Sequence, residues 1–174
     1  MITNRDALVH SPGHDDACRA LVAGIRAAHP GRVIEEAVSL EDDTLRIGEC
    51  TYDLDDYEQM LVLGGGNAAG TAAEALERVL GNRLDGGIVV TDDPTETESI
   101  EVVEGTHPLP SEANVAGTER LLEAARAAGD ETLALVVVTG GGSALLAHPT
   151  EGVDLSAYRE LTDTLITSGA TIDE

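Results

Sequence analysis

The 174-residue sequence contains no lysine, phenylalanine or tryptophan, and it has only three tyrosines. All ten basic residues are arginine and they form no cluster, whereas 33 residues are aspartate or glutamate. The formal net charge is therefore −23. A chain this acidic is not expected to bind nucleic acid or an anionic membrane surface, because both partners carry dense negative charge.

Long apolar runs and a leader segment are lacking as well. No run approaches the roughly 18 apolar residues that a membrane-spanning helix needs. The first residues contain no basic region followed by an apolar stretch, which is the pattern of a secretory signal. Two cysteines, Cys18 and Cys50, make no disulfide framework and are expected to be small buried side chains. These absences predict a cytoplasmic protein without a membrane partner.

The acidic residues are spread along the whole chain rather than gathered in one tail. Such a surface repels itself at low salt, and this repulsion opposes the compact state. At molar salt the Debye length falls to about 3 Å, so the repulsion is largely screened. The composition therefore predicts a halophilic protein from a high-salt cytoplasm. The alternative, an acidic interaction tail, would require a run of charge.

Continuous apolar runs, typical of strands in a parallel sheet, lie at Met60–Leu63, Gly87–Thr91 and Thr132–Thr139, and a shorter strand is expected at Ser99–Val103. Helical spacing and cap residues predict helices from Pro12 to before Pro30, over 68–81, from Ser111 to near Gly129 and from Leu155 onwards. Shorter extended pieces are expected at Val33–Leu40, Thr44–Ile47 and Thr51–Leu54. The predicted fold class is α/β, a Rossmann-like three-layer α/β/α sandwich with a mostly parallel sheet covered on both faces.

Two of the predicted strands end in triple-glycine turns that lead into helices. The turn residues are Gly64, Gly65, Gly66 and Asn67 after the first strand, and Gly140, Gly141, Gly142 and Ser143 after the last. Glycines let backbone N–H groups approach an anion without obstruction by a Cβ atom, and ligands of open α/β sheets bind at the carboxyl ends of strands. The pair of turns predicts an anion-binding cleft, whereas one such turn alone is a common structural bend.

Other polar residues have two interpretations each. Ser143 lacks the G-x-S-x-G elbow of a nucleophile, so it either hydrogen-bonds a phosphate or carboxylate or caps a helix. His107, in the segment HPLP, is either a turn residue or a polar group over the same sheet edge. The five histidines show no metal-ligand spacing, and we expect no metal site among them. Asp92 and Asp93 form a solvated turn or hold Mg²⁺ together with water.

Gly64, Gly66 and Ala69 also fit the dinucleotide fingerprint G-x-G-x-x-G/A, with Asp92 as the ribose-binding acid. Because the fingerprint is short, glycine-rich turns match it by chance. The second turn is not a phosphate loop of the G-x-x-x-x-G-K-[ST] type, since it has no lysine.

In order, the segments LVLGGGNAAGTAAEAL, LDGGIVVT, VVEGTHPLPSE, LVVVTGGGSALLAHPTEGVDL and LTDTLITSGATIDE resemble the glycerate 2-kinase family, whose C-terminal part is the MOFRL domain. Some of these kinases are named hydroxypyruvate reductases. The resemblance implies ATP- and Mg²⁺-dependent phosphoryl transfer to glycerate, which gives 2-phosphoglycerate, in a cleft shared with a second domain. It implies that both turns and His107 bind substrate or phosphate and that Asn67 is catalytic.

The sequence departs from the family in two respects. The first turn usually reads GxGKAA, and Asn67 stands at the lysine position; an amide forms hydrogen bonds but supplies no charge. Family members are also more than twice this long, so we expect residues 1–174 to be the N-terminal Rossmann-like domain of a glycerate 2-kinase-like protein, truncated before the MOFRL domain. Expected partners are glycerate and a nucleotide, with a second copy or a complementary C-terminal half. The alternatives are a non-catalytic fragment that binds a small anion or a complementary chain, and an NAD(P)H-dependent hydroxypyruvate reductase.

Overall fold

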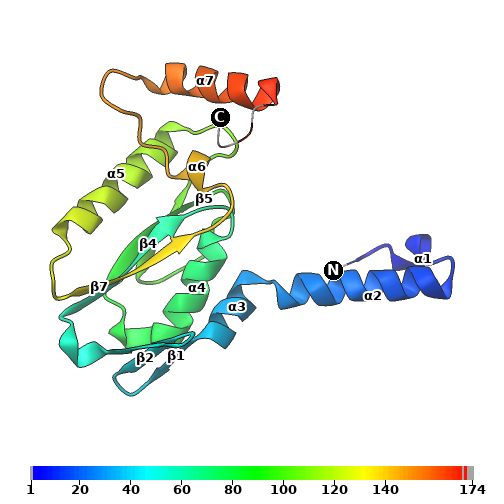
Figure 1. The fold of residues 1–174 in the computed structure, drawn as a ribbon, viewed down its shortest axis with the longest axis horizontal. Helices are drawn as coiled ribbons and strands as arrows, with labels where there is room; N and C mark the ends of the chain where they lie inside the picture. The colour runs from blue at the N-terminus through cyan, green and yellow to red at the C-terminus, as the bar shows by residue number, and fades with distance from the viewer. Residues whose placement is uncertain (1, 170, 172–174) are drawn as a thin grey trace.

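The computed structural model of the chain describes residues 2–169 and 171. A four-stranded sheet at its centre has the order β6-β5-β4-β7, and every neighbouring pair is parallel (Figure 1). A small antiparallel sheet has the order β1-β2-β3. In chain order the strands are β1 (Val38–Glu41), β2 (Thr44–Ile47), β3 (Cys50–Asp53), β4 (Gln59–Gly65), β5 (Gly86–Thr91), β6 (Ile100–Glu104) and β7 (Thr132–Val138).

The described residues form seven α-helices. They are α1 (Arg5–Leu8), α2 (Pro12–Ala27), α3 (Pro30–Ala37), α4 (Ala69–Leu80), α5 (Glu112–Ala127), α6 (Gly142–Leu145) and α7 (Leu155–Ser168), with short 3₁₀ turns at Leu54–Asp56 and Gly81–Arg83. Figure 1 shows α4 and α5 on opposite sides of the sheet. Successive side chains of a strand point to opposite faces. Accordingly, Val89 belongs to the core that includes Leu76 of α4, whereas Val90 lies beside Gly117 of α5. This arrangement confirms the predicted three-layer α/β class.

The small sheet packs against both α3 and α4 through β1. Val38, Leu45 and Leu54 are buried in the same cluster as the α4 side of the central sheet. On the surface, Arg78 of α4 reaches Glu35 of α3, with 2.5 Å between the charged groups. The two sheets therefore share one hydrophobic core.

The prediction of an extended segment over Val33–Leu40 is wrong for its first half. Residues Pro30–Ala37 form α3, and the strand begins only at Val38. Pro30 occupies the first turn of α3, where its missing N–H and fixed φ favour a helix start. The proline that ends α2 therefore begins the next helix.

The apolar faces of α2 and α7 are largely exposed rather than buried in the core. Helix α2 buries no residue, projects from the body (Figure 1), and leaves Leu21 and Ile25 58% and 60% exposed. In α7, Leu161 and Leu165 are 56% and 46% exposed. Helical periodicity identifies which side of a helix is apolar, but it does not identify what covers that side.

Strand β7 is covered on one face rather than two. Leu133, Leu135 and Val137 pack against the core on the α4 side. Val136 and Val138 point to the other face and are 67% and 69% exposed, because α5 lies across β5 and β6 instead. The prediction that both faces of the sheet are covered is therefore wrong at this edge strand.

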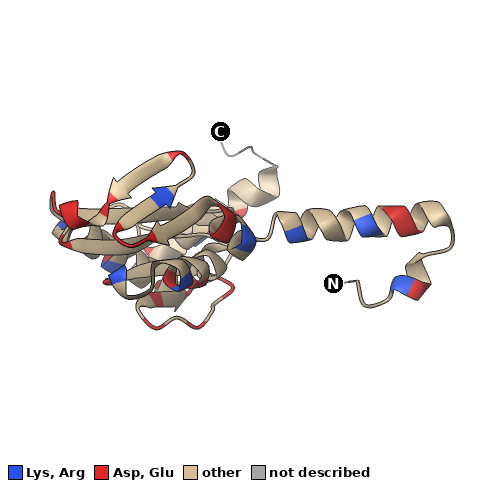
Figure 2. Ribbon diagram, turned by 90° about the horizontal axis from the view of Figure 1, so that it is seen from below, with Lys and Arg blue, Asp and Glu red and all other residues tan. Residues whose placement is uncertain are grey.

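The expectation of buried cysteines is also wrong, since Cys18 is half-buried and Cys50 is exposed. Both lie on elements at the margin of the core, α2 and β3. Acidic residues occur on helices, strands and loops over the whole body rather than on one face (Figure 2). Within residues 2–169 and 171, no helix is long and apolar enough to cross a membrane.

Candidate functional site

The two glycine-rich turns lie side by side at the carboxyl ends of β4 and β7. The Asn67 N–H donates to the Gly140 carbonyl at 2.7 Å, and the Thr139 N–H donates to the Gly65 carbonyl at 3.1 Å. A third link runs from the Ala68 N–H to the Thr139 hydroxyl at 3.2 Å. The parallel pairing of β4 with β7 produces this contact, because it brings the carboxyl ends of both strands to one edge.

Glycine is required in these turns by close packing of the backbone. A Cβ atom on Gly66, whose φ is +133°, would overlap the Thr139 hydroxyl. A Cβ atom on Gly141, whose φ is +80°, would overlap Oδ1 of Asn67. Positive φ and close approach both favour glycine whether or not a ligand binds. The glycines therefore have a structural explanation, and their role toward an anion stays a prediction.

The two turns differ in whether their backbone N–H groups already donate hydrogen bonds within the protein. In the first turn, the N–H groups of Gly66 and Asn67 donate to the carbonyls of Val90 and Gly140, at 3.0 and 2.7 Å. In the second turn, the N–H groups of Gly140 and Gly141 donate to no acceptor among the described residues. The first turn is therefore closed by internal hydrogen bonds, and the second turn keeps donors that a ligand can use.

Asn67 is half-buried between the turns, and its side chain is paired with Asp92. The Nδ2 group donates to both carboxylate oxygens of Asp92, at 2.8 and 2.9 Å. The Thr91 hydroxyl donates to the Asn67 carbonyl at 3.2 Å. Asp92 follows β5 directly, so this pair joins the ends of two neighbouring strands. An Asp92 engaged in this way does not present a free carboxylate to a ribose.

Three of the predicted site residues line one cavity of about 560 Å³: His107, Gly141 and Ser143. His107 belongs to the turn between β6 and α5, which contains a cis His107–Pro108 peptide bond. The opposite wall is α7, with Tyr158, Leu161, Thr162, Leu165 and Ile166. Gly64, Gly65 and Gly66 of the first turn are buried and do not line this cavity. Neither do the remaining predicted site residues, Asn67, Gly140 and Gly142. The structure thus brings His107 and the second turn together.

The cavity is poor in positive charge. No arginine is among the described residues that line it. The described residues also contain no group of three or more His, Cys, Asp or Glu side chains arranged to hold a metal ion. An anion in this cavity would depend on backbone N–H groups, the hydroxyls of Ser143 and Tyr158, and His107 for its contacts.

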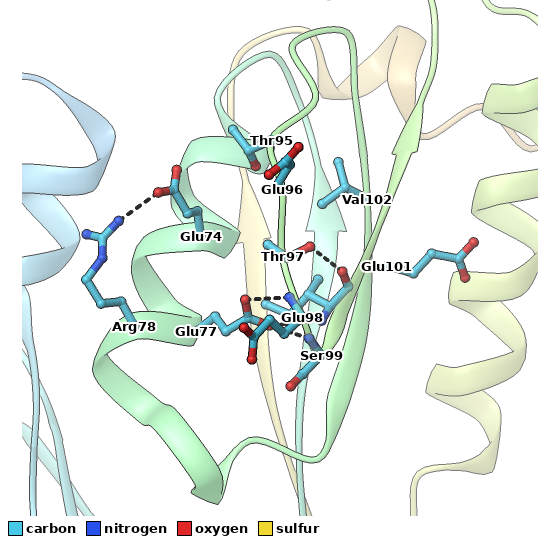
Figure 3. Close-up of a pocket in the computed structure, with 11 residues that line it drawn as sticks. Glu74, Glu77, Arg78, Thr95, Glu96, Thr97, Glu98, Ser99, Glu101 and Val102 are labelled. Atoms are coloured by element: carbon cyan, nitrogen blue, oxygen red, sulfur yellow. Dashed lines mark hydrogen bonds and ion pairs between the residues drawn. The ribbon is translucent and has the colours of Figure 1, made fainter.

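A second, larger cavity of about 1020 Å³ lies between α4 and the segment that leads into β6 (Figure 3). Its wall carries Glu74, Glu77, Glu96, Glu98 and Glu101. Burial raises the pKa of Glu77, but N–H groups of Glu98, Ser99 and Ile100, at 2.8, 2.5 and 3.2 Å, hold the pKa below its ordinary value. These hydrogen bonds to Glu77 hold residues 98–100 against α4.

Asn114, which is completely buried at the start of α5, was not identified as a functional residue from the sequence. Its side chain makes hydrogen bonds with the His107 turn and with α6. The signal in the sequence was Ser111 three residues before a polar residue, the spacing of a reciprocal helix cap.

A family model described as "Domain of unknown function (DUF4147)" matches residues 16–174. The chain belongs to the DUF4147 family. It is 32% identical over 158 residues to "Glycerate 2-kinase" of Pyrococcus horikoshii, covering 90% of this chain and 35% of that protein. It is 34% identical over 116 residues to "Putative hydroxypyruvate reductase" of Agrobacterium vitis, covering 66% of this chain and 30% of that protein.

Solved structures agree with this membership. A Pyrococcus horikoshii protein superposes with a TM-score of 0.79 at 29% identity, covering 95% of this chain and 37% of that one. Glycerate kinase of Thermotoga maritima superposes with a TM-score of 0.69 at 28% identity, covering 90% and 35%. The DUF4147 chain described here therefore spans about a third of the length of the proteins that it matches.

Proposed function

We propose that this chain is the N-terminal domain of a glycerate 2-kinase, which transfers a phosphoryl group from ATP to glycerate and yields 2-phosphoglycerate. The observation that carries the proposal is the pair of open N–H groups on Gly140 and Gly141 at the carboxyl edge of a parallel sheet, where Gly141 lines one cavity with His107 and Ser143. Backbone donors that need no rearrangement are suited to anionic groups. The remainder of the cleft comes from the part that the longer relatives possess and this chain does not span.

The two turns then have different roles. The second turn binds the carboxylate or phosphate through N–H groups and the Ser143 hydroxyl. The first turn, closed on itself, fixes the position of the second through the Asn67–Gly140 hydrogen bond. Asn67 borders the site with its amide held by Asp92, so its proposed catalytic contact is made through Oδ1 or after release of Asp92.

Phosphoryl transfer requires neutralisation of phosphate charge, and the cavity has no arginine of its own among its described lining residues. Mg²⁺ bound to ATP takes most of its ligands from phosphates and water, with one or two carboxylates from the protein. Asp92 has both oxygens engaged by Asn67, whereas Asp93, the next residue, is an exposed carboxylate. We therefore assign Asp93 as the carboxylate that would hold a nucleotide-borne Mg²⁺, and further positive charge to the rest of the cleft.

The test is phosphorylation of glycerate by this chain in molar KCl, with and without a polypeptide that corresponds to the unmatched part of the Pyrococcus relative. Phosphorus NMR distinguishes 2-phosphoglycerate from its 3-isomer. We expect ATP-dependent 2-phosphoglycerate formation that requires both chains. High salt is part of the proposal, because we place this acidic protein in a high-salt cytoplasm. If neither ATP nor glycerate binds to the chain or to the pair, the kinase assignment is wrong.

A reductase is the second candidate, because two relatives from Agrobacterium vitis carry the name "Putative hydroxypyruvate reductase". The geometry gives it less support, since both oxygens of Asp92 accept hydrogen bonds from Asn67. NADH oxidation with hydroxypyruvate, assayed under the same conditions, separates the two activities. A third outcome, anion binding without turnover by the pair, would identify a non-catalytic fragment.

A further inference from the structure

We propose that Asn114 is a positioning residue that holds the two polar walls of the 560 Å³ cavity, the His107 turn and the Gly140–Ser143 turn, in fixed relation to each other. Its amide donates at 3.0 Å to the carbonyl of Thr106, which precedes His107. It also donates at 3.0 Å to the carbonyl of Ala144, which follows Ser143. One buried side chain is thus hydrogen-bonded to the chain neighbours of both His107 and Ser143.

The acceptor side of the same amide has a different role. Oδ1 of Asn114 accepts from the Thr106 N–H at 2.9 Å, the Ser111 N–H at 3.0 Å and the Ser111 hydroxyl at 2.6 Å. The hydrogen bonds from Ser111 to Asn114 are local and cap the start of α5. The bond from Nδ2 to Ala144 contributes nothing to the cap, because Ala144 lies 30 residues further along the chain. The two sides of the amide can therefore be tested separately.

Burial makes this link sensitive to substitution. Asn114 is 0% exposed, and the backbone of Gly105 is so near that a Cβ atom there would lie 2.9 Å from Oδ1 of Asn114. While a side chain the size of asparagine fills this space, water has no room to replace a lost donor without movement of one of the turns. A buried carbonyl left without a donor is costly, so loss of Nδ2 favours separation of the His107 turn from α6.

Asn114→Asp is the informative variant. It keeps an acceptor for Thr106 and Ser111 but places a second oxygen against the carbonyls of Thr106 and Ala144. Asn114→Ala removes both the donor and the acceptor of the amide without burying a charge. It replaces Asn114→Asp in the test if the aspartate variant does not fold. The matched control is Thr118→Val, one turn further along α5, where the side chain is 4% exposed and its hydroxyl has no partner among the described residues.

The first measurement is amide hydrogen exchange, which does not depend on the proposed function. The Leu145 and Leu146 N–H groups close α6 on the carbonyls of Gly141 and Gly142, at 3.0 and 2.8 Å. We expect both Asn114 variants to accelerate their exchange about tenfold relative to amides of β4. Thr118→Val is expected to leave this ratio unchanged. Equal acceleration in α6 and β4, or none in α6, would overturn the link.

The second measurement rests on the proposed function, because it uses the proposed product as probe. The dissociation constant of 2-phosphoglycerate is measured in molar KCl well below the melting temperature of each variant, so that stability alone does not change it. We expect about tenfold weaker binding in the Asn114 variants and wild-type binding in Thr118→Val. Absence of binding by the wild type would count against the proposed function, and exchange alone would then decide the link. Unchanged affinity beside a binding wild type overturns the positioning role.

Discussion

Substitution of Gly141 by alanine tests the packing of the two turns. At a φ of +80°, an L-residue costs about 1–2 kcal/mol relative to glycine. The new Cβ atom would also overlap Oδ1 of Asn67 and displace an amide that donates two hydrogen bonds to Asp92. Because Asp92 is exposed, we assign about 1–2 kcal/mol to this displacement. The free energy of unfolding should therefore fall by about 2–4 kcal/mol.

The adjacent glycine supplies the control. A Cβ atom on Gly140 would have Oδ1 of Asn67 as its nearest neighbour, at 3.9 Å, and Gly140 is not among the positive-φ glycines. Gly140→Ala should therefore change stability by less than about 1 kcal/mol. Urea unfolding in molar KCl, followed by far-UV circular dichroism, measures both variants.

A double-mutant cycle separates the two contributions at Gly141. In an Asn67→Ala background the overlap disappears, so Gly141→Ala should retain only the backbone cost of about 1–2 kcal/mol. Equal stability of Gly141→Ala and Gly140→Ala, or no coupling to Asn67, would refute the packing of the turns described above.

Four further substitutions test other parts of the structure. Thr118→Val should stabilise the fold by about 1 kcal/mol in thermal unfolding, because it removes a buried hydroxyl without a partner among the described residues; a destabilised variant would mean that the hydroxyl is hydrogen-bonded. Glu77 has a pKa lowered from 4.5, so its carboxylate stabilises the fold above that value, and the stabilisation is lost as pH falls through the folded pKa. Glu77→Gln should therefore be less stable than wild type near neutral pH and approach it in acid, and a pH-independent difference would contradict this. Leu76→Ala, in the core, should cost about 2–5 kcal/mol, whereas Leu161→Ala, 56% exposed, should cost less than about 0.5 kcal/mol in urea titrations; similar losses would mean that α7 is covered.

The central sheet could be predicted from sequence because its strands carry their own signal. Met60–Leu63 and Gly87–Thr91 are continuous apolar runs, and the structure places β4 and β5 over them. The burial of other segments depends on residues far away in the sequence, so it was harder to predict. Leu21 and Leu161 lie on apolar helix faces that nothing in the described residues buries, and local periodicity contains no information about that.

The candidate site, too, could be predicted from the sequence only in part. The positions of both glycine turns followed from strand ends, and their proximity followed from a parallel sheet. Which amides are free depends on hydrogen bonds between the turns, such as Asn67 to Gly140, that sequence patterns do not specify. The pairing of Asn67 with Asp92 and the buried link at Asn114 join residues 25 and 30 positions apart, and only the folded backbone brings them together.

The most direct test of the central claim is an amide NMR titration of this chain with 2-phosphoglycerate in molar KCl. We predict that the largest shifts occur at the N–H groups of Gly140, Gly141 and Ser143, and that the His107 signal shifts with the same half-saturation concentration. Shifts confined to the glutamate-lined cavity beside α4, or saturation without any change at Gly140 and Gly141, would contradict it.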